Sequence, residues 1–107
     1  MKVKKLLLTL ALLASTAQAY TPAQAAYLAG KLCPMTQQLA HTMYKSRLAG
    51  TPHEDMIERV NRRYHDDDDM RGMLLRVTDI VFSVDSVTDV RVQAGLVCQA
   101  HFMMQAR

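Results

Sequence analysis

Residues 21–50 read TPAQAAYLAGKLCPMTQQLAHTMYKSRLAG and contain the signals for one long helix. Thr21, Pro22 and Gln24 place a hydroxyl at the N-cap, a proline at the first helical position and an amide three residues after the cap, which together form a capping box. The apolar residues that follow recur at three- and four-residue spacing and make one face apolar: Leu28, Leu32, Met35, Leu39, Ala40, Met43 and Leu48. Gly50 supplies the C-terminal stop.

Pro34 and Gly30 interrupt this helical pattern. A proline inside a helix cannot donate its backbone hydrogen bond and crowds the preceding turn. We therefore expect a kink or a break near Cys33 rather than one straight rod.

Three further segments predict shorter helices. The sequence TPHE at 51–54 repeats the pattern of cap, proline and N3 carboxylate, and the four aspartates at 66–69 suit a linker that caps the following helix. The sequence SVTD at 86–89 is another helix start. The apolar faces after these starts are Met56, Ile57, Val60 and Tyr64; Met70, Met73, Leu74, Val77, Ile80, Val81 and Val84; and Val87, Val90, Ala94, Val97, Cys98, His101 and Phe102.

Cys33 and Cys98 are the only cysteines, and we expect them to form a disulfide. Closing this loop stabilises the fold by about 4 kcal/mol in the chain-entropy model, which matters for a domain with a small core. The bridge would join the first helix to the last. Because all predicted elements are helical and the connections are short, the sequence predicts an all-α fold, a small antiparallel four-helix bundle with one disulfide.

The first 19 residues are typical of a cleaved signal peptide. Three lysines precede an apolar run at 6–14, and Ala-Gln-Ala at 17–19 is a small-x-small cleavage site. Residues 20–107 would then be a single helical domain, exported to the periplasm or secreted. Cleavage removes three of the 13 basic residues and none of the 10 acidic residues, which leaves no net charge. This balance argues against nucleic-acid binding, and no later apolar stretch reaches the roughly 20 residues that membrane insertion needs.

We expect no enzymatic activity and no cofactor. Ser46, Ser83 and Ser86 are outside any nucleophile-elbow motif, and both cysteines would be oxidised. The paired carboxylates are confined to the aspartate run, without the apolar surroundings that would raise one pKa for acid–base catalysis.

The aspartate run is the strongest candidate for a cation site, because carboxylate oxygens are ligands of Ca²⁺ and Mg²⁺. If Asp67 and Asp69 take the first and third positions of an EF-hand loop, Thr78 occupies the twelfth, where a carboxylate is required. An EF-hand is therefore excluded. A looser site remains the alternative to a solvated linker neutralised by nearby arginines. Its candidate ligands are His65, Asp66, Asp67, Asp68 and Asp69.

The histidines give no zinc motif, because no two of them are spaced i, i+4 along a helix. His101 near Met103 and Met104, together with His41 near Met43, is the kind of N/S set that Cu(I) accepts, although methionines at stripe positions more often fill a core. We expect no bound metal.

The remaining functional candidate is an interaction surface. Four tyrosines lie partly off the apolar stripes and, with two C-terminal methionines, could form an adaptable apolar patch for a partner. The alternative is that they complete the core or its rim. The patch would bind another exported protein or a second copy of this chain. Its candidate residues are Tyr20, Tyr27, Tyr44, Tyr64, Met103 and Met104.

The chain resembles a group of small, two-cysteine, exported α-helical proteins of proteobacteria. The resemblance rests on Cys33 in the first helix, a basic pair before Gly50-Thr51-Pro52, the sequence Ile80-Val81-Phe82 and Cys98 in the last helix. It implies the fold and the compartment but no activity. In architecture alone the chain is also similar to the small acid-stress chaperones of the periplasm, which makes an acid-stress chaperone the second functional hypothesis.

Overall fold

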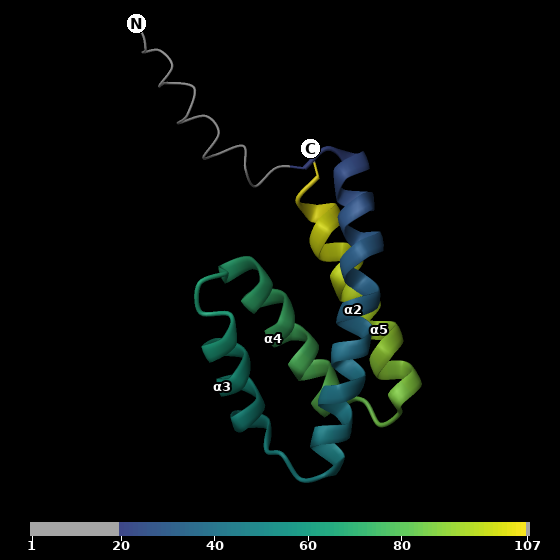
Figure 1. The fold of residues 1–107 in the computed structure, drawn as a ribbon. Helices are drawn as coiled ribbons and strands as arrows, with labels where there is room; N and C mark the ends of the chain where they lie inside the picture. The colour runs from purple at the N-terminus through teal and green to yellow at the C-terminus, as the bar shows by residue number, and fades with distance from the viewer. Residues whose placement is uncertain (1–19, 107) are drawn as a thin grey trace, which may run out of the picture.

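The computed structural model describes residues 20–106, which form four α-helices (Figure 1). These are α2 (Pro22–Leu48), α3 (His53–Arg63), α4 (Asp68–Ser83) and α5 (Val87–Met104). Between residues 20 and 106 the only β-type pairing is an isolated bridge of Tyr20 with Ala106. The prediction of an all-α fold is confirmed. The predicted signal peptide falls on residues 1–19, outside the described residues, and stays a prediction.

Helix α2 begins with the predicted capping box. The Thr21 hydroxyl accepts a hydrogen bond from the Gln24 backbone amide at 3.1 Å, and the Gln24 side chain accepts one from the Thr21 amide at 3.0 Å. These two bonds satisfy backbone donors that a helix start leaves unpaired. At the other end, Gly50 has a φ of 107°, a left-handed conformation that favours glycine and ends the helix.

Of the kink or break predicted near Cys33, the break does not occur: α2 continues through Pro34 as one helix. Pro34 removes only the hydrogen bond that residue 34 would donate to the Gly30 carbonyl, and both residues are exposed, so water can reach that carbonyl. The next turn is supported by the Thr36 hydroxyl, which donates to the Leu32 carbonyl at 3.0 Å. Packing of α2 against α5 outweighs the single lost bond.

The starts of the other helices follow the sequence in two cases of three. The Asp67 carboxylate accepts from the Met70 amide at 3.0 Å and caps α4, and the Ser86 hydroxyl caps α5 in the same way. The predicted Thr51 cap of α3 is wrong, since Pro52 occupies the N-cap position and no side chain caps the helix. Thr51 lies one residue too early to reach the first free amides.

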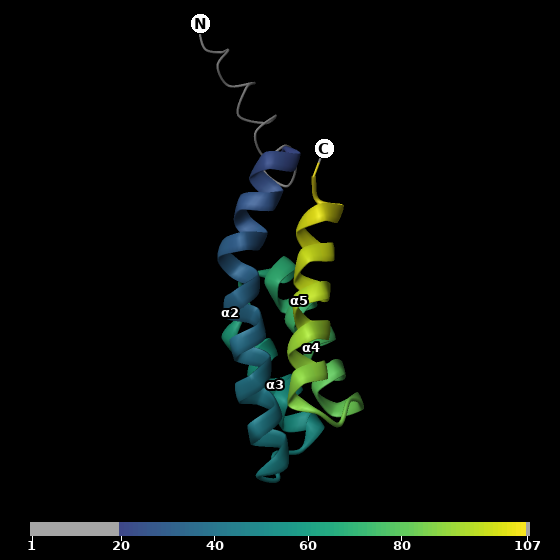
Figure 2. The same ribbon diagram turned by 90° about the vertical axis from the view of Figure 1, so that its right-hand side faces the viewer.

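The helices form the predicted antiparallel bundle. Helices α2 and α5 lie side by side along most of their length (Figure 2), while α4 packs against both and α3 covers the outer side of α4 (Figure 1). The ends of α2 and α5 that carry the chain termini extend past α3 and α4 (Figure 1). Residues 20–37 and 92–106, which include these ends, are called the arm, and residues 38–91 are called the core half.

The core is concentrated in the core half. Met73, Val77, Val81 and Val90 are completely buried there, as the apolar spacing of the sequence predicts. Of the predicted α2 stripe, only Ala40 and Met43 are buried. Leu28, Leu32 and Leu39 are partly buried, and Met35 and Leu48 are 65% and 67% exposed. The buried face of α2 is instead built largely from smaller residues: Ala25, Cys33, Thr36 and Ala40, with Met43 and Tyr44.

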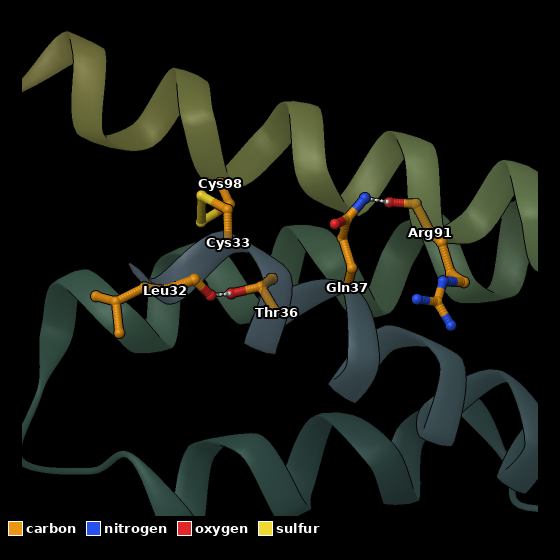
Figure 3. Close-up of a disulfide and its surroundings, with 6 residues drawn as sticks. All are labelled: Leu32, Cys33, Thr36, Gln37, Arg91 and Cys98. Atoms are coloured by element: carbon orange, nitrogen blue, oxygen red, sulfur yellow. Dashed lines mark hydrogen bonds between the residues drawn. A yellow bond between two sulfur atoms is a disulfide. The ribbon is translucent and has the colours of Figure 1, made fainter. Parts of the chain in front are cut away.

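The predicted disulfide between Cys33 and Cys98 is present and links α2 to α5 (Figure 3). The two Cα atoms lie 5.5 Å apart, so the helices approach closely at this point. One turn away, the Gln37 side chain packs over Gly95, where a Cβ atom would lie 2.7 Å from the Gln37 side-chain nitrogen. That nitrogen donates to the Arg91 carbonyl at 2.9 Å (Figure 3).

Candidate functional site: an uncharged groove between α2 and α5

Side chains of the aspartate run and of the preceding His65 contact neighbouring residues of the same segment. His65 lies 3.0 Å from the Arg62 carbonyl through Nδ1 and 3.2 Å from the Asp66 carboxylate through Nε2. Asp67 caps α4, and Asp68 pairs with Arg71, which also donates to the His65 carbonyl at 3.0 Å. These carboxylates therefore start a helix and fix a turn.

No metal centre is assembled from these candidates. Within residues 20–106, no group of three or more His, Cys, Asp or Glu side chains is placed to hold a metal ion. His65, Asp66, Asp67, Asp68 and Asp69 are all exposed to solvent. The structure places them next to one another along the chain without directing them to a common point.

The pKa of His101 is shifted by its surroundings. Partial burial against α4 lowers the pKa of the His101 imidazole below its usual value, and Arg76 lowers it further, while Asp69 and Asp67 raise it by a smaller amount. Its Nε2 lies 3.2 Å from the Gln105 side-chain nitrogen. An amide nitrogen only donates, so this contact suits the neutral ring, whose Nε2 accepts.

A groove of about 730 Å³ lies on the arm, between α2 and α5. Its α2 side is lined by small residues, and its α5 side carries larger apolar side chains. The main α2 lining residues are Ala25, Ala26, Ala29, Gly30 and Pro34, and those of α5 are Val92, Gly95, Leu96, Gln99 and Met103. None of the lining residues is charged.

The α5 side of the groove is an apolar ridge exposed to solvent. Val92, Leu96, Gln99 and Met103 follow one another at spacings of four, three and four residues, and we call this row the outer seam. The three apolar members are 50%, 60% and 70% exposed. The opposite side of α5 packs in the core through Val90, Ala94, Cys98 and Phe102. Helix α5 therefore has two apolar faces, of which one is buried.

Charge is divided unequally between the arm and the core half. All 10 acidic residues lie between Glu54 and Asp89, in the core half. The arm contains a single lysine or arginine, Lys31, whose ammonium lies 5.8 Å from the centre of the Tyr27 ring. The arm is thus an almost uncharged, two-helix projection with apolar side chains on its surface.

The six tyrosines and methionines predicted from the sequence do not form one exposed patch. Tyr44 is buried, at 7% exposure, and Tyr20 and Tyr64 are partly buried against the core. Of the six candidates, Met103 lines the groove, while Met104 and Tyr27 are exposed outside it. The residues that the sequence reasoning missed are Val92, Leu96 and the small residues opposite them. The four–three–four spacing on the second face of α5 was the signal that could have identified the outer seam.

Comparisons with protein families, with curated proteins and with solved structures find no match to this chain. None of the helices within residues 20–106 combines the length and the apolar character needed to cross a bilayer.

Proposed function

We propose that the protein is an exported, non-enzymatic helical protein that binds another polypeptide chain in the groove of the arm. The observation that carries this proposal is an uncharged groove beside an exposed apolar ridge. Burying apolar surface contributes roughly 25 cal/mol per Å², and no buried charge would oppose that gain here. Small residues on the floor let a second backbone approach closely, which suits a helix in a groove.

The Cys33–Cys98 disulfide supports the exported location, because such bonds persist in oxidising compartments. The role of the aspartate run in starting α4 supports a structural rather than a catalytic use of its carboxylates. In this proposal the partner binds through apolar contacts in the groove, without a metal or a cofactor.

Site-specific photo-crosslinking in the exporting cell tests the proposal. A benzophenone amino acid at Leu96, on the groove, should form an adduct with a polypeptide, whereas the same group at Gln93 should not. Gln93 is the matched control because it is exposed on α5 and does not line the groove. Filling the groove with Ala26→Leu should abolish the Leu96 adduct without lowering the melting temperature. Absence of any adduct, or equal adducts at both positions, would contradict a binding groove.

A second candidate function, an acid-stress chaperone, is favoured by the uneven charge distribution. Protonation of the carboxylates in acid would leave the core half with the positive charge of its arginines, lysine and histidines, and self-repulsion would loosen it. The disulfide would still hold the arm together. In acid below about pH 3, where carboxylates are protonated, this function requires new dye-binding apolar surface. A cooperative native state at that pH would rule it out.

A further inference from the structure

We infer that the polypeptide held in the groove is a second copy of this chain, whose α5 occupies the groove in a two-fold symmetric dimer. This inference rests on the proposed function, since it names the partner of the same groove. It follows from three properties of the arm: matched shapes on one face, the absence of charge, and the amide in the middle of the outer seam.

The first property is shape. A two-fold interface joins a surface to its own copy, so the surface must contain both a projection and the hollow that receives it. The arm has both on one face: α5 carries the projecting Val92, Leu96 and Met103, and α2 carries the hollow over Ala26 and Gly30.

The two rows also match in length and spacing. The hollow follows Ala26, Gly30, Cys33 and Gln37, with spacings of four, three and four residues. The outer seam from Val92 to Met103 has the same spacings and the same span, about 16 Å along a helix. The projecting row of one copy therefore fits along the hollow of the other.

The second property is charge. A two-fold interface brings charged groups that lie close to its axis near their own copies, and these like charges repel. The groove lining contains no charged residue, and the only lysine or arginine of the arm, Lys31, is not part of that lining. A partner with a charged docking helix would find no opposite charge to recognise in the groove. The charge pattern thus favours self-association over a partner selected by ion pairs.

The third property is Gln99, which interrupts the apolar members of the outer seam near its centre. An amide side chain has both a donor and an acceptor, so it can hydrogen-bond to its own copy across a two-fold axis. A single polar residue in an apolar seam sets the register and the number of helices at some cost in stability. Gln99 would then select the dimer over larger assemblies.

Sedimentation equilibrium of the purified, oxidised, exported protein tests this inference, and we expect a dimer at micromolar concentration. Leu96→Glu should weaken association by about 100-fold, because each dimer would bury two unpaired carboxylates. Gln93→Glu adds the same charge to an exposed site outside the groove and should leave the dimer intact. Since Leu96 is 60% exposed, its substitution should not unfold the protein, and an unchanged melting temperature of the diluted monomer would confirm this.

Crosslinking between isotope-labelled and unlabelled copies locates the contact. A photoreactive group at Leu96 should label the partner copy near Ala26 and Gly30. A dimer crosslinked elsewhere would overturn the inference. If the protein is a monomer and its Leu96 adduct in cells contains another polypeptide, the inference of a second copy would be overturned, and the proposed function would stand. A monomer with no adduct in cells would overturn both.

Discussion

The core half and the arm are held together in different ways. Seven large side chains are fully buried, and six of them, including Met73, Val77 and Val90, belong to the core half. The seventh is Cys98, one end of the disulfide. The arm exposes six of the seven large hydrophobic side chains on the surface and has almost no charge. The core half combines a packed interior with a charged surface, whereas the arm combines a disulfide with an exposed apolar surface, which we propose as a binding surface.

Removing the disulfide should cause the largest loss in the free energy of unfolding. The Cys33 to Cys98 bridge closes a loop of 65 residues that contains the whole core half. In the chain-entropy model its loss lowers the free energy of unfolding by about 4 kcal/mol. Urea denaturation of the Cys33→Ser, Cys98→Ser double variant measures this directly. A loss below about 1 kcal/mol would mean that core packing alone is sufficient, since surface substitutions usually stay within that range.

A pair of methionine truncations should separate the two regions. Met73 is completely buried in the core half, so Met73→Ala should cost about 3 kcal/mol through lost burial and a residual cavity. Met103 is 70% exposed, and Met103→Ala should change the free energy of unfolding by less than about 0.5 kcal/mol. Both are measured by urea denaturation in the Leu96→Glu background, where association does not contribute. Similar costs at the two positions would show that the arm packs as tightly as the core half.

Much of the fold could be predicted from the sequence, because the signals are local. The Thr21, Asp67 and Ser86 caps act over three residues, and the buried faces of α4 and α5 follow helical spacing. Even the disulfide followed from the count of two cysteines. The unbroken helix at Pro34 could not be predicted, because it depends on tertiary packing against α5.

The groove could not be predicted for a similar reason. It depends on which face of α2 turns towards α5, and the stripe of large residues suggested a different face from the one that packs. Met35 and Leu48 belong to that stripe and are exposed, whereas the alanines that line the groove and pack beside it carry little hydrophobic signal. Small residues mark close helix approach only when the partner helix is known.

A smaller loss of stability is expected when the hydrogen bonds between α2 and the end of α4 are removed. The Arg47 guanidinium donates to the Val81 and Val84 carbonyls at 2.9 and 2.8 Å, which satisfies acceptors that the end of α4 leaves free. Arg47→Met should lower the free energy of unfolding by about 2 kcal/mol. Asp85, which pairs with the same guanidinium at 3.2 Å, is 91% exposed, so Asp85→Asn should change it by less than about 0.5 kcal/mol. Equal losses in denaturant unfolding would assign the effect to the ion pair instead of the carbonyls.

The smallest effect should be a pH dependence at His101, where the arm lies beside α4. Burial lowers the pKa of His101 in the folded protein, so the unfolded chain binds a proton more readily than the folded one. The stability that His101 contributes is therefore complete above the usual histidine pKa of about 6.5 and is lost as the pH falls through the lower folded value. Denaturant unfolding between about pH 7 and 5 should show a larger loss for the wild type than for His101→Gln. Parallel curves would mean that protonation of His101 does not disturb the contact of α5 with α4, and the arm would then be insensitive to mild acid.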